Sequence, residues 1–398
     1  MRSETDLFRR AHEKAALSFP RIDLVASVNT ERVLDAFIRH RVSDACFAFG
    51  TGYAYGERGR DTLDKLWADV FFAEDALVRV QFVSGTHAIA CALRAARSDA
   101  QGYLSLVGEP YDTVKPAAPY NFVPEAPDGK ADRDAVRAAI IRHKPRAVLI
   151  QRSCGYRRRK ALSVADIAEL VGIVKDIDED IVTVCDNCYG EFCEESEPCA
   201  AGVDMTAGSL IKNPGGGLCV AGGYIAGKKY WVDKAAQALT APGIGRECGG
   251  SLGLGRSLYQ GLFLAPHVTA QALKTALFAA SLMELLGYEV CPRPEEERYE
   301  ITQAIKFGRR DILLSFVRAV QHASPVDSFA EPQPWNMPGY DDEVVMAAGT
   351  FVQGASIELS CDAPMREPYT AYLQGGLTYE SGRLAVWRAA VALEGGAL

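Results

Sequence analysis

The chain has 398 residues, of which 48% are hydrophobic, and its 51 acidic side chains outnumber 43 Lys and Arg to give a formal net charge of -8. This apolar content excludes a disordered chain, and the length is enough for two packed units. The acidic balance argues against nucleic-acid binding as the main function, because phosphate contacts need clustered Lys and Arg. The longest apolar stretch, residues 261–287, contains Pro266, Lys274 and Glu284, so we expect no membrane span.

The first part of the chain predicts helices followed by an open sheet. Residues 1–45 have helical patterns, with Asn29 and Thr30 placed to cap a helix over 31–42, and Thr62 is expected to open the next helix. Short β-rich runs then alternate with helices of about 12 residues, which is typical of a mostly parallel sheet with helices on its faces. The expected strands lie within residues 76–83, 102–110, 147–153, 181–187 and 222–227.

After residue 255 the pattern changes to that of a smaller α+β unit. Its expected elements are a long helix near 257–287, a strand at 288–292, a helix near 300–322, strands at 344–352 and 356–360, and a last helix near 376–393. We therefore divide the chain into an N-terminal helical arm over 1–50, a large domain over 51–255 and a small domain over 256–398, which begins with the long connecting helix.

Ligands of open parallel sheets bind beyond the carboxyl ends of the strands, and this rule selects five loops. The loops contain Ser84-Gly85-Thr86, Tyr111, Asp186, Lys212, and a segment with Tyr53, Tyr55, Arg58 and Arg60. Small residues at 84–86 suit either an anion at a helix N-terminus or a plain helix cap. Asp186, directly after a strand, either caps a turn or pairs with a buried cation.

Lys212 is unusual because its neighbours are small and apolar. Partial burial lowers the pKa of a lysine and makes a neutral, nucleophilic amine accessible, whereas the alternative is a loop lysine that pairs with phosphate or carboxylate. Tyr111 alone is as consistent with packing as with function. The segment with Tyr53 and Tyr55 either offers phenols and guanidinium groups to an anion or is an ordinary surface loop.

The order of these features along the chain, SGT, Tyr111, Asp186 and then Ser209-x-x-Lys212, resembles the fold-type-I enzymes that use pyridoxal 5'-phosphate. The chain is most similar to the cysteine and methionine metabolism group, and within it to the methionine γ-lyase-like or aluminium-resistance family. The similarity extends from about residue 50 to 385 and includes the stretches VSGTHAI, DNCYGEF, GSLIKNPGGG, YQGLFLAPH, MPGYDD and YLQGGLTY. It implies a mixed, mostly parallel sheet flanked by helices, with a smaller α+β C-terminal domain.

The resemblance also implies roles for individual residues. Lys212 matches the lysine that forms the Schiff base with the cofactor and then moves protons at the substrate's Cα and Cβ. Asp186 matches the aspartate that keeps the pyridine nitrogen protonated, so that the ring accepts electrons in a quinonoid intermediate. Tyr111 matches the tyrosine that stacks on the ring and protonates the leaving group.

Other matches concern the phosphate and the oligomer. Ser84, Gly85, Thr86 and Ser209 match the groups that hold the phosphate. The segment with Tyr55 resembles one that reaches a neighbouring subunit's phosphate, together with an arginine for which Arg60 or Arg58 stands here. The resemblance therefore implies a homo-oligomer with shared active sites, a dimer at least and a tetramer as the usual state of the group.

The chain departs from the better-known γ-lyases at several positions. Ile211 replaces a hydroxyl residue before the lysine, and Glu57 stands where their loop has an arginine. No clear motif marks the arginine for the substrate carboxylate. We expect Arg366, with Arg383 as the alternative, because a guanidinium binds a carboxylate through two hydrogen bonds.

The sequence also offers candidates for contact with the substrate. Tyr53 and Cys154 are expected to lie near the substrate, and Cys154 stands where the nearest family tends to have a basic residue. The remaining cysteines are expected to be reduced, mostly buried thiols of a cytoplasmic protein, because no signal peptide precedes them. The run from Cys185 to Cys199 suggests a metal only weakly, since Cys185 must face away if Asp186 faces the cofactor.

These observations together predict a lyase that removes a β- or γ-substituent from an amino acid by breaking a carbon–sulfur, carbon–halogen or similar bond. The alternatives are a γ-replacement transferase or an aminotransferase, and a non-catalytic homologue. We expect pyridoxal 5'-phosphate as the cofactor, no metal, and no nucleic-acid or membrane partner.

Overall fold

The computed structural model describes residues 6–97, 102–126, 129–157 and 159–395, so residues 1–5 of the first expected helical region lie outside the described residues. Its larger sheet has seven strands in the order β1-β7-β6-β5-β4-β2-β3. They are β1 (Asp75–Arg79), β2 (Tyr103–Ser105), β3 (Tyr120–Phe122), β4 (Ala147–Gln151), β5 (Val182–Asp186), β6 (Met205–Ser209) and β7 (Gly223–Gly227).

The pairing of these strands confirms the mixed, mostly parallel sheet. The pairs from β3 through β2, β4 and β5 to β6 are parallel, whereas β7 runs antiparallel to both β6 and β1. Every residue of β4, β5, β6 and β7 is buried. Strands covered on both faces need continuous apolar or small residues, which explains why these segments do not alternate between apolar and polar side chains.

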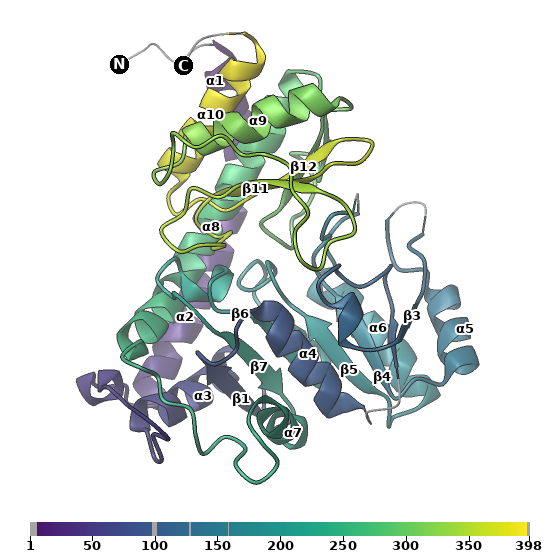
Figure 1. Cartoon of the computed structure of the whole chain (residues 1–398), viewed down its shortest axis with the longest axis vertical. Helices are drawn as coiled ribbons and strands as arrows, with labels where there is room; N and C mark the ends of the chain where they lie inside the picture. The colour runs from purple at the N-terminus through teal and green to yellow at the C-terminus, as the bar shows by residue number, and fades with distance from the viewer. Residues whose placement is uncertain (1–5, 98–101, 127–128, 158, 396–398) are drawn as a thin grey trace.

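Helices cover both faces of the large sheet (Figure 1). On one face α4 (Gly85–Ala96) and α7 (Lys229–Leu239) pack in a core with strand residues such as Leu149, Val184 and Ile225. On the other face α3 (Arg58–Val70), α5 (Arg133–His143), α6 (Val164–Ile177) and the first part of α8 (Gly255–Leu285) pack in two further cores. Because the faces of the sheet are covered, a ligand can approach it at the edge where the parallel strands have their carboxyl ends.

The smaller sheet is antiparallel, in the order β10-β11-β12-β9-β8. Its strands are β8 (Glu289–Cys291), β9 (Gln303–Lys306), β10 (Val344–Ala347), β11 (Ser360–Pro364) and β12 (Thr370–Gln374). Helices α9 (Arg310–His322) and α10 (Tyr379–Leu393) and the second part of α8 pack on it around one hydrophobic core.

The small domain corrects three details of the sequence analysis. The helix expected near 300–322 is divided into β9 and α9, because Gly308 takes a left-handed conformation with φ of 70° between them. The strand expected at 356–360 lies at 360–364 instead, since the Glu358 carboxylate accepts the N–H groups of Phe351 and Val352 and holds this segment as a loop. Strand β12 was not predicted.

The N-terminal helices pack along α8. Helix α1 (Asp6–Ala16) belongs to the core of the small domain, and α2 (Phe19–Arg39) follows α8 towards the large sheet (Figure 1). The predicted cap at Asn29 is wrong, because α2 is continuous there and the buried Asn29 amide donates to the carbonyls of Phe192 and Glu194. Helix α3 begins at Arg58, before Thr62. Within the described ranges, no helix is long and apolar enough to span a membrane.

Candidate active site

A pocket opens at the carboxyl ends of β5 and β6, and β10 and β11 of the small domain close its other side. We call it the central pocket. Its lining includes seven residues that the sequence had selected, Ser84, Gly85, Thr86, Tyr111, Asp186, Ser209 and Lys212. The other residues of its wall include Gln151, Cys188, Tyr189, Tyr340, Met346, Thr350, Ser356, Ser360 and Asp362.

The start of α4 approaches the end of β6 very closely. A Cβ atom on Gly85 would lie 3.0 Å from the Ser209 Cβ and 3.2 Å from the Cys188 Sγ, so glycine is the residue that fits. The Ser84 Oγ accepts the N–H of His87, which makes Ser84 the helix N-cap. The free N–H groups of the first turn of α4 and the Ser209 hydroxyl therefore face one small space, which suits a phosphate.

Lys212 follows β6 by three residues, and its ammonium lies 3.9 Å from the centre of the Tyr189 ring. Burial by itself disfavours the charged amine, but the nearby acidic groups of Cys188, Tyr189, Asp186 and Glu191 outweigh burial and raise its pKa above the ordinary lysine value. The expected lowering of the lysine pKa is therefore wrong for this arrangement. The apolar neighbours in sequence gave no sign of the acidic groups that other segments supply.

Asp186 is the last residue of β5, and its side chain lies 6% exposed in the central pocket. Its Oδ1 accepts the N–H of Cys188 at 3.0 Å. Burial raises the pKa of Asp186, and the charge of Lys212 opposes that rise. Cys185, the preceding residue, packs in the hydrophobic core on the opposite face, so Asp186 and Cys185 do point in opposite directions.

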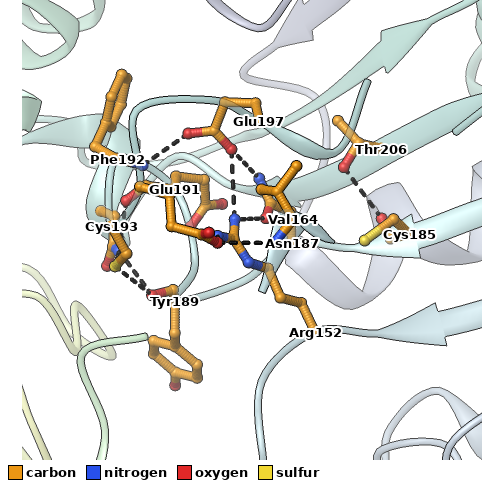
Figure 2. A network of polar contacts seen from close by, with 12 residues as sticks. Arg152, Val164, Cys185, Asn187, Tyr189, Glu191, Phe192, Cys193, Glu197 and Thr206 are labelled. Carbon is orange, nitrogen blue, oxygen red and sulfur yellow. Dashed lines mark hydrogen bonds and ion pairs between the residues drawn. The ribbon is translucent and has the colours of Figure 1, made fainter. Parts of the chain in front are cut away.

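A buried polar network holds the loop after β5 in place (Figure 2). The Arg152 guanidinium is fully buried and donates to Asn187 Oδ1 at 2.8 Å and to Glu194 Oε2 at 2.6 Å. Asn187 donates in turn to Glu197 Oε2, whose carboxylate also accepts the N–H of Phe192. Because Asn187 follows Asp186 directly, this network fixes the backbone that carries the Asp186 carboxylate.

Tyrosine side chains form the wall that faces β10 and β11. The Tyr111 and Tyr340 hydroxyls are 2.9 Å apart, and the two rings meet edge to face at 5.9 Å. Tyr156 contacts both rings and donates its hydroxyl to Asp362 Oδ2 at 3.4 Å. Burial raises the pKa of Tyr111 well above its usual value, so its hydroxyl keeps a proton.

Arg366, Arg383 and Cys154 are not brought into the central pocket. The Arg366 guanidinium pairs with Asp342 at 2.6 Å and lies in a neighbouring recess that shares Tyr111 with the pocket. Arg383 lies over the Phe8 and Tyr379 rings, on α10. The Cys154 thiol is buried and donates to the carbonyl of Gly155, because the backbone turns at Gly155 with φ of 57°. Arg366 and Cys154 therefore do not line the central pocket.

The segment with Tyr53 and Tyr55 also lies away from the central pocket of its own chain. The two rings stack at 5.5 Å and are 70% and 69% exposed. Arg60, in contrast, is buried and donates to Asp61 and to the carbonyl of Ala54. The hydrogen bonds of Arg60 are thus made within its own chain. Arg58 is exposed and is therefore the better candidate of the two for binding the phosphate of a neighbouring subunit.

Three pocket residues were missed as individual candidates. Tyr189 and Tyr340 lie within DNCYGEF and MPGYDD, which were recognised only as family stretches. Asp362 was missed because the strand was placed four residues too early. Alternation along the correct strand, with Ser360 and Asp362 on one face, is the signal that identifies it.

All eleven cysteines are free thiols, nine of them buried. Among the described residues, no group of three or more His, Cys, Asp and Glu side chains is arranged to hold a metal ion.

Comparison with known proteins places this geometry in a family. The family model described as methionine gamma-lyase matches residues 4–394. The chain belongs to the methionine gamma-lyase family. Within it, the protein YnbB of Bacillus subtilis is 46% identical over 381 residues, which span 92% of this chain and 90% of that protein.

Solved structures agree with the family assignment. A carbon-sulfur lyase involved in aluminum resistance from Clostridium novyi NT is 44% identical, with a TM-score of 0.91, and covers 96% of this chain and 94% of its own. The pyridoxal-5'-phosphate dependent protein YhfS of Escherichia coli is only 16% identical, with a TM-score of 0.64 over 93% of this chain and 97% of its own. This second likeness shows that the methionine gamma-lyase family member described here has the fold expected from its sequence.

Proposed function

We propose that the protein is a pyridoxal 5'-phosphate-dependent lyase that eliminates a β- or γ-substituent from an amino acid. The observation that carries the proposal is the position of Lys212, a half-buried amine that lines one pocket with the Asp186 carboxylate and with the tight approach of Gly85 to Ser209. Few ligands require a nucleophilic amine, an anion site and a carboxylate together in one pocket, and this cofactor requires all three.

The residues present fit the cofactor. The first turn of α4 at Ser84, Gly85 and Thr86, with the Ser209 hydroxyl, would hold the phosphate. Asp186 would face the pyridine nitrogen, and Tyr111 would lie against the ring. When bound, the cofactor supplies an electron sink next to the substrate's Cα.

The chain's own residues supply the proton transfers. Lys212, once its amine is released by the substrate, is the base that removes the Cα proton and, for a γ-substituent, the next proton from Cβ. Tyr111 keeps its hydroxyl proton because of burial and donates it to the leaving group as the carbon–heteroatom bond breaks. The unsaturated product then hydrolyses to a ketoacid and ammonia.

Two related activities, γ-replacement and transamination, remain as alternatives because they use the same cofactor residues. Because Arg366 and Arg383 lie outside the central pocket, we do not assign either of them to the substrate carboxylate. We further propose a cytoplasmic homo-oligomer in which Tyr55 and Arg58 reach a neighbouring subunit's cofactor. The exposure of both side chains supports this arrangement.

The first test is the covalent attachment of the cofactor. Protein incubated with pyridoxal 5'-phosphate and then reduced with borohydride is expected to carry the label on Lys212, and the purified protein is expected to be yellow. The Lys212→Ala variant should lose the label, whereas Lys229→Ala, which removes an exposed lysine, should keep it. A label that persists in Lys212→Ala would reject the assignment.

The second test identifies the reaction. Methionine, cystathionine, homocysteine and γ-halogenated amino acids are incubated with the loaded enzyme, and ketoacid, thiol and ammonia are measured. Release of ketoacid together with ammonia supports elimination. An amino group that moves to an added ketoacid would instead identify an aminotransferase, and a new thioether formed with an added thiol would identify a transferase.

A further inference from the structure

A second carboxylate, that of Asp362, faces the central pocket from the small domain. Asp362 is the middle residue of β11, and its Cα partners are Met346 on β10 and Tyr372 on β12. Side chains alternate along the strand, so that Ser360 and Asp362 line the pocket and Cys361 packs in the core behind it. The pairing on both sides therefore fixes the direction of this carboxylate.

The chain's own residues give the Asp362 carboxylate only long, weak hydrogen bonds. The side chain is 7% exposed, and its Oδ2 accepts hydrogen bonds from Tyr156 Oη and Gln374 Nε2 that are both 3.4 Å long, near the limit of a hydrogen bond. Within the described part of the chain, Oδ1 accepts none. Burial raises the pKa of Asp362 to about 6, and the charge of Lys212 acts in the opposite direction.

No cation of the chain remains for Asp362 in the working enzyme. Among the described residues, Lys212 is the one cationic side chain that lines the central pocket. Under the proposed function Lys212 serves the cofactor and the Cα proton, and Asp186 pairs with the ring nitrogen. A buried carboxylate without a cation is costly, so the complementary charge is expected from the ligand.

The surroundings of Asp362 favour a cation as well. Tyr340 and Tyr111 line the same pocket, and Tyr156 packs between Tyr340 and Tyr372 with ring centres 5.9 and 5.3 Å away. The faces of tyrosine rings attract positively charged nitrogen and repel anions. A carboxylate beside several tyrosine rings therefore favours a cationic ligand over an anionic one.

We propose that Asp362 and Tyr340 bind a positively charged nitrogen on the side chain of the amino-acid substrate and disfavour an anionic side chain. The inference rests on the proposed function, because the substrate's α-amino group is then used to join the cofactor. The cation must consequently belong to the side chain or to the leaving group. Asp362 is in this way a residue that determines specificity.

The test uses compounds that differ only in charge. They are S-(2-aminoethyl)-, S-propyl- and S-(2-carboxyethyl)-L-cysteine, and the same three substituents on L-homocysteine. Dissociation constants are measured by calorimetry with the loaded enzyme, and kcat/KM is measured from ketoacid release. We expect aminoethyl compounds to bind at least about tenfold more tightly than propyl compounds, since hydrogen bonds between charged groups are stronger than those between neutral groups.

The Asp362→Asn variant keeps the shape of the side chain and is expected to bring the aminoethyl-to-propyl ratio of affinities close to one. Tyr340→Leu should lower the ratio, and Tyr340→Phe, which keeps the ring, should preserve it. Asp311→Asn, which removes an exposed carboxylate on α9, controls for the change in net charge and should not alter the ratio. Thermal unfolding of each variant checks that it is folded.

Two kinds of result would overturn the inference: wild-type enzyme that binds propyl or carboxyethyl compounds as tightly as aminoethyl compounds, or a preference that survives in Asp362→Asn. Failure of the aminoethyl compounds to bind would also overturn it. The proposed function fails separately, if no compound or amino acid yields ketoacid while the affinities still follow Asp362.

Discussion

Glu191, a second acid close to Lys212, is fully buried in the loop after β5. Its Oε1 accepts the hydroxyl of Tyr224 at 2.9 Å, and in the described chain its Oε2 has no hydrogen-bond partner. Burial raises the pKa of Glu191 from the ordinary 4.5 to about 8. The folded protein therefore holds a proton on Glu191 at pH values where the unfolded chain has already released it.

This difference predicts how one substitution changes with pH. The raised pKa means that Glu191 costs stability increasingly as pH rises from about 4.5 to about 8, by at most about 1.4 kcal/mol per pH unit. Glu191→Gln removes this cost. The variant's melting temperature, relative to wild type, should therefore rise between about pH 5 and about pH 8.

The control for this prediction is Glu295→Gln, because Glu295 is exposed. Its difference from wild type should stay flat over the same pH range. A flat difference for Glu191→Gln as well would mean that Glu191 is ionised in the folded protein, contrary to the pKa that burial gives it.

At the scale of residues, the sequence predicted the positions that the backbone dictates. Gly85, Asp186, Ser209 and Lys212 follow strands or begin a helix, and all four line the central pocket. The pKa of Lys212 was predicted wrongly, and Arg366 does not line the central pocket, because both depend on long-range neighbours. The partner of Arg366 is Asp342, in a loop whose path the sequence does not specify.

One helix and one turn determine where Lys212 lies. The turn Asn213–Gly215 directly follows the lysine and packs against α8 with almost no space between the two backbones. A Cβ atom on Gly261 of α8 would lie 2.4 Å from the carbonyl oxygen of Gly215. The carbonyl of Gly261 is equally close to where a Cβ on Gly216 would stand, at 2.3 Å.

Two glycine substitutions in helices are therefore expected to have opposite effects. Gly261→Ala forces the turn away from α8, and we expect a loss of about 1–3 kcal/mol in stability together with weaker retention of the cofactor on Lys212. Gly172→Ala in α6 meets no atom within 4 Å and should stabilise the protein by about 0.5–1 kcal/mol.

Chemical unfolding and the visible absorption of the loaded protein measure the two effects. Equal stability changes for Gly261→Ala and Gly172→Ala, or full cofactor retention in Gly261→Ala, would contradict the close packing of α8 on the turn.

At the scale of elements, β1, β2, β4, β5 and β7 of the large sheet were predicted because each has its own apolar pattern. The short β3, the small-residue strand β6 and the helices α5 and α7 were not predicted. The small domain was harder. Residues 300–322 carry a continuous apolar pattern, and only the left-handed turn at Gly308 separates β9 from α9. Similarly, Asn29 has the chemistry of a cap, but its contacts with Phe192 and Glu194 let α2 continue past it.

The exposed pair Tyr53 and Tyr55 concerns the whole molecule. Stacked aromatic rings with about 70% exposure are unusual on a surface that remains in water. Under the proposed arrangement, each central pocket is completed by this segment of a neighbouring subunit. If an active site takes residues from two chains, each of two variants can lack one of these residues, and a mixed pair still contains one complete site.

Mixing two inactive variants tests this directly. Lys212→Ala and Tyr55→Ala are co-expressed with different tags, and mixed oligomers are purified. One of the two sites of each purified mixed pair then has both native residues, so we expect recovery of about half of wild-type ketoacid release. Each variant alone should be nearly inactive or strongly reduced. Mixed oligomers that are no more active than the average of the two variants would place each active site within one chain.

The packing of α1 has a consequence for how the protein is made. Phe8 of α1 contacts Phe278 of α8 and Trp387 of α10, with ring centres 5.2 and 5.4 Å apart, so α1 and α10 belong to one core (Figure 1). On the ribosome, the first helix emerges long before the last one is synthesised. All strands of the large domain are synthesised before α10, so this domain is expected to fold first. The apolar face of α1 stays uncovered until its partner α10 is made. The newly made chain is thus exposed to chaperones and proteases at α1 until α10 has been synthesised.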